Sequence, residues 1–583
     1  MPLGEVRPGM VGVGRTVFEG DRLDTFQVHI LGVLHNVVGP RRSLVLARLE
    51  GGPLAHTGVI AGMSGSPVYV DGKLLGAVSY ALGLFSKEPI AGITPIAEMT
   101  DATALETAPR GTRAVAVSWP PAPGDLLRIW ARDLGLSRPF ADDPAELLVA
   151  SGGVDAARTG ALLRPIAVPL VTAGFHPDAL AVVEPLFARS GMVLASAPGG
   201  QLPAASSPSA PLRPGDAVGV SLMGGDFVLG ATGTVTHVDG DRVYAFGHPM
   251  YNLGPTAFPM TRAAVHVVLP SLQQSVKLAS FGDVVGTIQQ DRATAVAGRL
   301  GPGPAVIPVD ITLNSDRAAT RQFTFTVVKD PTFTPLLTYL AVANVLTSYE
   351  RGAGPASFTV RGSASIHRHG DIAFEDIFTG DQPAGGAAAY VAGPLTLLLR
   401  NGADPVDVEK ITLTIDATEE SRAARIERVW LDTERPRPGD TVVVKVLLRT
   451  GRGEEIVTSV PVQIPVNAAG SLQLLVADAT RLGAEDRRGT AGMENQPIPQ
   501  IIRTLNRARR GNRLYVRLSA PDQGAVVNGE PMAALPPSVL AVLEADRQSG
   551  SFSALRSATR GEWSVPAEFA ITGARQLTIQ LER

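Results

Sequence analysis

Residues 62–80 read GMSGSPVYVDGKLLGAVSY and are the most informative stretch of the sequence. Ser64 lies between Gly62 and Gly65, in a turn where the backbone bends sharply and other groups can approach closely. A short apolar strand begins after Pro67, an Asp-Gly pair reverses the chain, and a second strand returns. The stretch therefore predicts a serine presented at the base of a β-hairpin.

The same turn has the chemistry of a nucleophile. The backbone N–H groups of Gly62 and Ser64 can point in one direction beside the hydroxyl and form an oxyanion hole. A serine hydroxyl also needs a neighbouring base. Of the nine histidines, His248 is the strongest candidate, because Gly247 and Pro249 fix it in a turn at the end of an apolar strand. We interpret Ser64 as the nucleophile and His248 as its general base.

Spacing alone does not select a third catalytic residue. A carboxylate normally orients the imidazole through its second nitrogen. The candidates are one residue upstream of the nucleophile and four around or after the histidine: Glu50, Asp239, Asp241, Asp283 and Asp291. A serine–histidine dyad without a carboxylate also stays open.

An internal repeat indicates two similar β units. The sequence Arg-Pro-Gly occurs at 7–9 and again at 213–215, each time before a strand pattern. The hairpin tip Gly-Asp-Arg follows at 20–22 and at 240–242. Two related units in one chain are what a double β-barrel would contain.

The chain of 583 residues is too long for one hydrophobic core. Its 62 Gly and 46 Pro favour strands and tight turns over long helices. We expect a Ser-bearing unit at 1–110, an α/β insert with a Pro/Ser-rich linker (195–214) at 111–212 and a His-bearing unit at 213–370. A helical connector at 371–420, a β-sandwich at 421–478 and an α+β domain at 479–583 would follow. Apolar spacing predicts helices at 126–136, 178–189, 332–350, 387–399, 499–508 and 537–546.

Composition narrows the function. The formal net charge is −3 with no long run of one sign, which argues against nucleic-acid binding. The chain has no Cys, so disulfides, zinc–thiolate sites and thiol nucleophiles are excluded, and no metal or cofactor is expected. No stretch is apolar enough to span a bilayer. Residues 1–20 show no signal-peptide pattern, so we expect the mature part of an exported precursor.

The two catalytic segments resemble the SpoIVB peptidase family, the sporulation stage IV B serine peptidases, which have a trypsin-like fold. Those enzymes carry the turn Gly-Met-Ser-Gly-Ser-Pro, which is present unchanged at 62–67. They also carry a Gly-His pair after a strand, here 247–248, a Thr-Gly lead-in, here 57–58, and a glycine-rich stretch after the histidine, here 285–301. The resemblance says little about residues 371–583.

The resemblance implies both a fold and an activity. The implied fold is mainly β: a trypsin-like double β-barrel split by the α/β insert, followed by the β-sandwich and the C-terminal α+β domain. The implied activity is that of a serine endopeptidase of restricted specificity, acting on protein or peptide substrates in the periplasm or cell envelope. The linker at 195–214 would be a site for self-cleavage, and the C-terminal domains would present substrate or dock a partner.

Two departures from the family leave alternatives open. In the sporulation enzyme the histidine segment precedes the serine segment, so the reversed order here implies a circularly permuted domain. The family's acid lies upstream of the nucleophile, where only Glu50 could replace it. The alternative function is therefore a catalytically silent envelope scaffold or adhesion protein. A further alternative is an acyl substrate other than a peptide, such as an ester.

Overall fold

The structure is a computed structural model that describes the chain except residues 83–85, 105–113, 135–162, 197–210, 350–354, 381, 403, 487–492, 494–495, 528–529, 533–535, 537, 540–551 and 583. The chain divides into two compact units. The first comprises Met1–Thr112, Leu126–Val309 and Phe323–Asn344, and the second comprises Arg113–Asp125, Asp310–Gln322 and Val345–Arg583. Ser64 and His248 both belong to the first unit.

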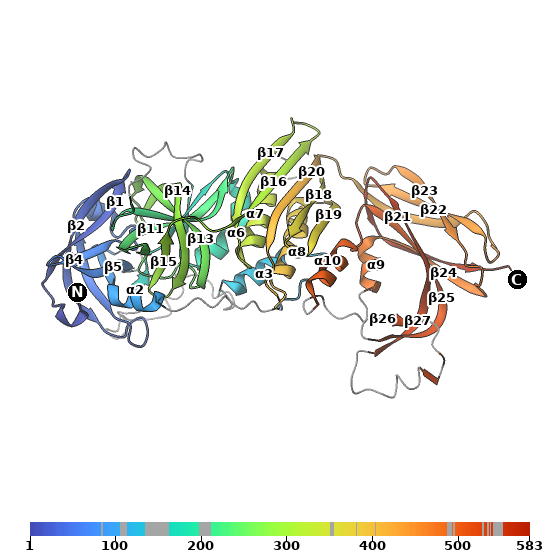
Figure 1. The fold of residues 1–583 in the computed structure, drawn as a ribbon. Helices are drawn as coiled ribbons and strands as arrows, with labels where there is room; N and C mark the ends of the chain where they lie inside the picture. Colours follow the sequence, from blue (N-terminus) through green and yellow to red (C-terminus); the bar gives the residue numbers. More distant parts are fainter. Residues whose placement is uncertain are drawn as a thin grey trace, which may run out of the picture. The chain divides into compact units, whose positions relative to one another are not determined.

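Six antiparallel strands near the N-terminus form a closed barrel, drawn in blue in Figure 1. They are β1 (Val11–Glu19), β2 (Arg22–Leu34), β3 (Leu44–Glu50), β4 (Pro67–Val70), β5 (Lys73–Leu82) and β6 (Ile90–Pro95). Around the barrel they follow the order β1-β2-β3-β6-β5-β4, and β4 closes the ring by pairing with β1. Buried side chains from alternating positions, such as Val28 and Ile30, fill the interior.

A second barrel has the same topology. Its strands are β10 (Ala217–Gly225), β11 (Val228–Asp239), β12 (Arg242–Ala245), β13 (Gly254–Leu269), β14 (Val276–Arg292) and β15 (Ala295–Leu300). They follow the order β10-β11-β12-β15-β14-β13, and β13 closes the ring by pairing with β10. Numbered along the chain within each barrel, both rings read 1-2-3-6-5-4. This confirms the expected mainly-β fold with a trypsin-like pair of barrels.

Of the two repeated motifs, only the Arg-Pro-Gly turn occupies the same position in both barrels. Each Arg-Pro-Gly turn precedes the first strand of a barrel, and its glycine donates a hydrogen bond to the second strand, from Gly9 to Ile30 at 2.9 Å and from Gly215 to Val235 at 2.7 Å. The Gly-Asp-Arg tips are not equivalent. The first joins strands one and two of its barrel, whereas the second joins strands two and three.

The segment between the barrels contributes strands to both of them. It contains α3 (Pro123–Asp133), β7 (Leu163–Pro165), β8 (Val168–Ala173), α6 (Pro177–Arg189) and β9 (Met192–Ser196). Strand β7 pairs with β5 of the first barrel, and β8 pairs with β11 of the second. Helices at 126–136 and 178–189 were expected from the spacing, and α3 and α6 lie there. Most of the linker at 195–214 is outside the described residues.

Shorter helices flank the first barrel, and three longer elements follow the second. The short ones are η1 (Leu3–Glu5), α1 (Leu54–Thr57) and α2 (Ile96–Thr103). The later ones are β16 (Val306–Ser315), β17 (Arg321–Val328) and the apolar helix α7 (Phe333–Tyr349). The helix expected at 332–350 thus lies where the apolar run predicted it.

The second unit begins with strands around an apolar helix. Strand β18 (Ala356–Ile366) pairs on either side with β19 (Gly370–Gly380) and β20 (Val408–Thr418), and α8 (Pro383–Leu399) lies between the last two in sequence. Residues 371–420, expected as a helical connector, therefore hold two strands as well. The run at 387–399 is apolar throughout and therefore stands out in the sequence. Strands β19 and β20 mix buried with exposed residues, so their pattern is weaker.

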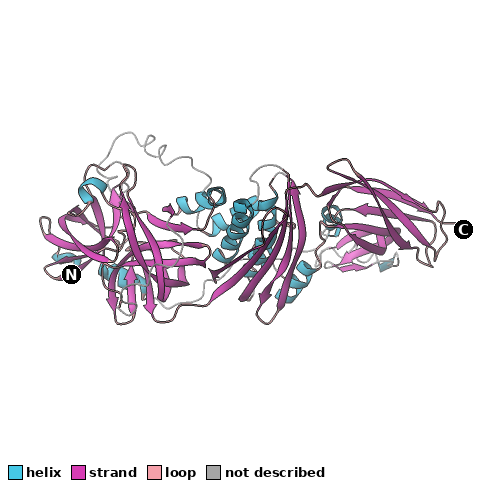
Figure 2. Ribbon diagram, turned by 90° about the horizontal axis from the view of Figure 1, so that it is seen from above, coloured by secondary structure: helices cyan, strands magenta, loops and turns pink. Residues whose placement is uncertain are grey.

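The last part of the chain forms two sheets around one core. One sheet contains β21 (Ala423–Leu431), β22 (Thr441–Thr450), β23 (Glu455–Gln463) and β28 (Ala570–Thr572). The other contains β24 (Ser471–Ala477), β25 (Arg513–Val527), β26 (Glu530–Met532), β27 (Phe552–Pro566) and β29 (Ala574–Gln580). The sandwich expected at 421–478 thus shares its core with strands beyond 512. Figure 2 shows the predominance of strands in magenta.

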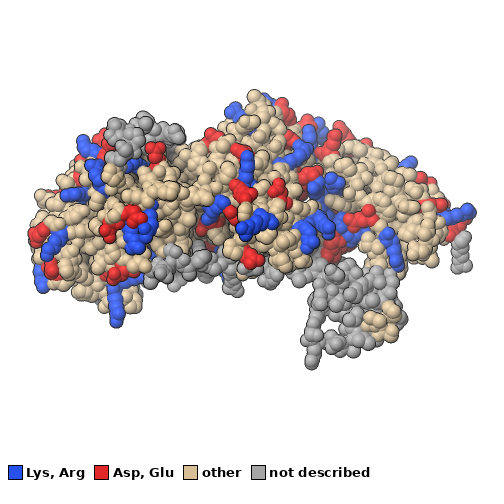
Figure 3. Space-filling view, in the orientation of Figure 1, with Lys and Arg blue, Asp and Glu red and all other residues tan. Residues whose placement is uncertain are grey.

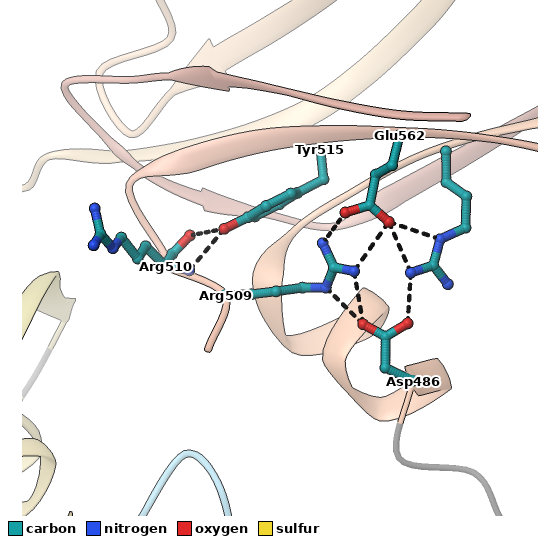
Figure 4. A network of polar contacts seen from close by, with 6 residues as sticks. Asp486, Arg509, Arg510, Tyr515 and Glu562 are labelled. Atoms are coloured by element: carbon teal, nitrogen blue, oxygen red, sulfur yellow. Dashed lines mark hydrogen bonds and ion pairs between the residues drawn. The ribbon is translucent and has the colours of Figure 1, made fainter. Parts of the chain in front are cut away.

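Two short helices and an ion network accompany this sandwich. Helices α9 (Ala479–Asp486) and α10 (Ile498–Asn506) precede β25. In Figure 4, Arg509 lies between the carboxylates of Asp486 and Glu562, at 2.7 and 2.6 Å. Burial raises the pKa of Glu562, but hydrogen bonds from Arg509 and Arg517 outweigh it and lower that pKa below its ordinary value. The helix expected at 537–546 lies almost wholly outside the described residues.

Charges of both signs are interspersed on the face shown in Figure 3. Within the described part of the chain, no helix is both long and apolar enough to cross a membrane. The described residues also contain no group of three or more His, Asp or Glu side chains arranged to hold a metal ion.

Candidate active site

Ser64 lies in the loop between the third and fourth strands of the first barrel. The turn needs glycine at two positions, since Gly62 and Gly65 have φ angles of +94° and +97°. A side chain on Gly65 has no room, because its Cβ would lie 1.9 Å from the carbonyl oxygen of Thr234 in β11. The glycines that mark the turn in the sequence therefore allow it to press against the second barrel.

Threonines of the second barrel hold this turn by its carbonyl groups. The Thr234 hydroxyl donates to the Gly62 carbonyl at 3.0 Å, and the Thr234 N–H donates to the Ser64 carbonyl at 2.8 Å. The Thr236 hydroxyl donates to the Gly65 carbonyl at 2.7 Å. Three carbonyl groups of the turn are thereby fixed on β11.

The backbone N–H groups of Gly62 and Ser64 have no acceptor among the described residues. The neighbouring N–H groups are used, because Met63 donates to Ile60 and Gly65 donates to Val78. The two unused N–H groups are the pair that the sequence predicted as an oxyanion hole. Their availability is what an oxyanion hole requires.

His248 occupies the corresponding loop of the second barrel, between its third and fourth strands. Phe246 and Gly247 both have positive φ angles, +69° and +70°, so the chain turns sharply just before the histidine. The first barrel holds this loop in return, because the Thr94 hydroxyl donates to the Gly247 carbonyl at 2.7 Å. The Ser79 hydroxyl lies 2.7 Å from that of Thr94 and supports it.

The environment of His248 keeps its imidazole neutral. Burial lowers the pKa of His248 to about 4, and the contact with the Pro249 carbonyl offsets only part of this effect. That contact joins Nδ1 to the carbonyl oxygen at 2.8 Å, so Nδ1 carries the proton and donates it. The other nitrogen, Nε2, then has a free lone pair, which is the form a general base needs.

The two loops meet, but the Ser64 and His248 side chains do not bond to each other. A Cβ on Gly65 would lie 2.6 Å from the backbone nitrogen of Phe246, so the loops touch at their backbones. The Ser64 Oγ and the His248 Nε2 are both buried, and neither has a hydrogen-bond partner in the described part of the chain. Two unpartnered polar atoms of complementary chemistry thus lie in adjoining loops.

Four of the five candidate acids lie away from the His248 imidazole. Glu50 binds His29 at 3.0 Å on an exposed surface, and Asp241 binds Arg299 at 2.7 Å at a hairpin tip. Asp239 and Asp283 are exposed. None of these four bonds to the imidazole, whose Nδ1 is used by the Pro249 carbonyl.

The exception is Asp291, which is fully buried beside the histidine loop. Its carboxylate accepts hydrogen bonds from the backbone N–H groups of Met250, Tyr251 and Leu253, at 2.8, 2.7 and 3.2 Å. Burial raises the pKa of Asp291, and these hydrogen bonds oppose the shift. Asp291 therefore fixes the residues that follow His248, through the backbone rather than through the imidazole.

Three threonines that hold the two candidate loops are not marked by any sequence motif. The hydroxyl groups of Thr94, Thr234 and Thr236 act across the barrel interface, and no local motif marks them. The alternating Thr232-Gly233-Thr234-Val235-Thr236 is a signal for an unusually polar buried strand, since all three threonines are buried. The partners of Thr234 and Thr236, however, are 172 and 171 positions away in the chain.

Comparison with known proteins agrees with the N-terminal signature. Residues 4–99 match the model of the family SpoIVB peptidase S55, which covers the first barrel and the Ser64 turn. This part of the chain is therefore SpoIVB-like. No curated protein and no solved structure matches the chain.

Proposed function

We propose that the chain is a serine peptidase in which Ser64 attacks a peptide carbonyl and His248 takes up the hydroxyl proton. The N–H groups of Gly62 and Ser64 would stabilise the resulting oxyanion. The observation that supports this most strongly is topological. Two barrels of identical strand order each carry one of the two residues in the loop between strands three and four, and these loops touch.

The imidazole would work without a carboxylate partner. The Pro249 carbonyl holds the proton on Nδ1, so Nε2 can accept the proton of the Ser64 hydroxyl as the bond from Oγ to the substrate carbon forms. Nε2 then returns this proton to the leaving amine as the peptide bond breaks. A carbonyl stabilises the transient imidazolium less than a carboxylate does, so we expect slower turnover than in a full triad.

The order of the two barrels supports a circularly permuted arrangement relative to the sporulation enzymes. The Ser-bearing barrel comes first here, and both barrels are complete rings. The match of the first barrel to a peptidase family also supports an exported protein that acts on proteins or peptides in the cell envelope.

A fluorophosphonate probe, which labels only activated serines, tests the proposal. Labelling of the native chain should disappear in Ser64→Ala and fall at least about 100-fold in His248→Ala, the usual effect of losing a general base. Ser221→Ala, which removes a partly buried hydroxyl on β10, is the matched control and should keep full labelling. Ser64 is buried, so the proposal is contradicted if labelling is absent both from the native chain and from a variant in which Ser64 is uncovered.

A silent scaffold is the second candidate. It is favoured by the missing hydrogen bond between Ser64 and His248 and by the missing carboxylate on the imidazole among the described residues. The same labelling experiment decides between the two. If labelling occurs, a peptide library and a panel of esters would then separate peptidase from esterase activity.

A further inference from the structure

Strand β5 has an edge beside the nucleophile turn, and a segment of the same chain occupies it. The Val78 carbonyl accepts the N–H of Gly65 at 2.8 Å, so this point of β5 touches the Ser64 turn directly. From the next residue onward, the free edge of β5 pairs antiparallel with β7, which brings Pro165 opposite Tyr80. The Ile166 N–H donates to the Ser79 carbonyl at 2.9 Å and extends this ladder to within one residue of Val78.

The segment then passes over the nucleophile turn. A Cβ on Gly62 would lie 3.2 Å from the Pro169 ring, so the chain reaches the proposed oxyanion hole three residues after Ile166. The Ile166 side chain is 2 % exposed and belongs to the apolar cluster that contains Met63 and Val78. Ser64 is 0 % exposed in the same structure, so its hydroxyl has no access to solvent.

This arrangement has the features of a bound peptide. Extended peptides bind by adding a strand to a sheet edge, with main-chain hydrogen bonds for affinity and a side-chain pocket for specificity. Residues 163–166 supply both, namely the ladder to β5 and the buried side chain of Ile166. Among the described residues no carbonyl of the segment bonds to the N–H groups of Gly62 or Ser64. The segment is thus held beside the proposed catalytic centre without entering its oxyanion hole.

We infer that residues 163–166, which lie on β5 just before β8 begins, occupy the peptide-binding groove of this protein as a built-in inhibitor. Substrate peptides bind along the same edge of β5 after displacing the segment, with a branched apolar side chain in the place of Ile166. This inference rests on the proposed function, since it names the groove and the regulation of that same site. It also accounts for the burial of the nucleophile.

Peptide binding tests the inference without requiring catalysis. The protein carries Ser64→Ala, and the probe is a fluorescent peptide with the sequence of residues 163–170, Leu-Arg-Pro-Ile-Ala-Val-Pro-Leu. Adding Ile166→Asp to the protein puts a charge in the apolar site and should expel the segment. The affinity for the peptide should then rise about tenfold or more, because the fraction of open groove limits the apparent affinity.

Two controls match this design. Leu272→Asp makes the same kind of change at a side chain that is 90 % exposed, and should leave peptide affinity unchanged. A peptide with Asp in place of its isoleucine should bind neither protein. If Ile166→Asp does not fold, Ile166→Ala replaces it, with a smaller rise expected. A folded variant that gains no peptide affinity overturns the inference.

The same variants are also labelled with the fluorophosphonate probe in the protein that keeps Ser64. This distinguishes failure of the inference from failure of the proposed function. Faster labelling of Ile166→Asp together with peptide binding supports both. Peptide binding without labelling supports the groove and contradicts the peptidase. Labelling at the native rate without peptide binding supports the peptidase and shows that residues 163–169 only strap the two barrels together.

Discussion

The burial of His248 couples its protonation to folding. An exposed histidine has a pKa of about 6.5, and burial lowers that of His248 to about 4. Between these values the unfolded chain binds more protons than the folded one, so stability is lost as pH falls through this window. The full loss, below the lower value, corresponds to about 3 kcal/mol.

We therefore expect His248→Gln to flatten the pH dependence of the free energy of unfolding between pH 6.5 and 4. Urea unfolding at a series of pH values measures this. His56→Gln changes an exposed histidine and should leave the native pH dependence unchanged. An equal slope in the native chain and in His248→Gln would show that the imidazole is solvated rather than buried.

Lys277 is a second buried titratable group, and it lies under the nucleophile turn. Its Nζ donates to the Thr16 hydroxyl at 2.7 Å, and its aliphatic stem lies 3.3 Å from the position of a Cβ on Gly62. Burial lowers the pKa of Lys277 to about 7, against an opposing effect of Asp24. Above pH 7 the folded chain therefore holds this lysine mainly neutral while the unfolded chain still protonates it.

At low pH the buried Lys277 is charged in the folded chain, and burying this charge lowers the free energy of unfolding. Lys277→Met should therefore stabilise the protein by about 2 kcal/mol at pH 6. The gain should shrink as pH rises toward 10. Thermal unfolding at pH 6 and pH 9 gives the comparison, with the exposed Lys73→Met as control. A destabilised Lys277→Met at pH 6 would mean that the hydrogen bond to Thr16 outweighs the cost of burying the charge.

At the level of the strands, each barrel holds the Ser64 or His248 loop of the other. Strand β11 fixes the serine turn through Thr234 and Thr236, and β6 fixes the histidine turn through Thr94. Both hydroxyl contacts of β11 end on carbonyl groups that are buried with the turn. Loss of such a donor leaves a buried carbonyl unsatisfied, which costs about 1–3 kcal/mol.

Thr234→Val and Thr236→Val should each lower the stability of the chain by about 1–2 kcal/mol. They should also slow probe labelling of Ser64 about tenfold, because the oxyanion N–H groups lose their orientation. Thr232→Val is the matched control, since the Thr232 hydroxyl is buried on the same strand and has no hydrogen-bond partner among the residues that the structure describes. Equal effects of all three substitutions would contradict a role for these contacts in positioning the turn.

At the scale of the whole molecule, the C-terminal sandwich is closed by residues distant in the chain. The core around Val444 and Val446 of β22 includes Val516 of β25 and Ile579 of β29. Strand β21 also pairs in parallel with β28, which brings Ala424 opposite Ile571. The core of the sandwich is therefore complete only when strands from both ends of the 423–580 region come together.

Val516→Asp should consequently unfold strands on both sheets. A buried unpaired charge costs several kcal/mol, so we expect a loss of at least about 3 kcal/mol. Hydrogen exchange should show β22 losing protection together with β25. Val457→Asp, at a side chain that is 53 % exposed on β23, should change neither. Protection retained in β22 of Val516→Asp would show that residues 421–478 fold independently.

The sequence alone determined the local features of this protein. The turn around Ser64 can be predicted because its positive φ angles require glycines. The turn around His248 can be predicted because Gly247 precedes it. Helices such as α7 are legible because their apolar residues are contiguous. The mainly-β class followed from strand patterns. The pair of barrels followed from a repeat of two motifs, of which the Arg-Pro-Gly turn is equivalent in the two barrels and the Gly-Asp-Arg tip is not.

Which distant groups meet is visible only in the folded chain. The contacts of Thr234 with Gly62 and of Thr94 with Gly247 depend on how the two barrels pack, and no local pattern encodes that packing. The bond between Ile166 and Ser79 depends on how the segment between the barrels pairs with β5. The same holds for Asp291, whose sequence neighbourhood resembles that of any strand end. A backbone conformation that only glycine adopts easily can be recognised in the sequence. Contacts between residues far apart depend on the burial and hydrogen bonding of the complete fold.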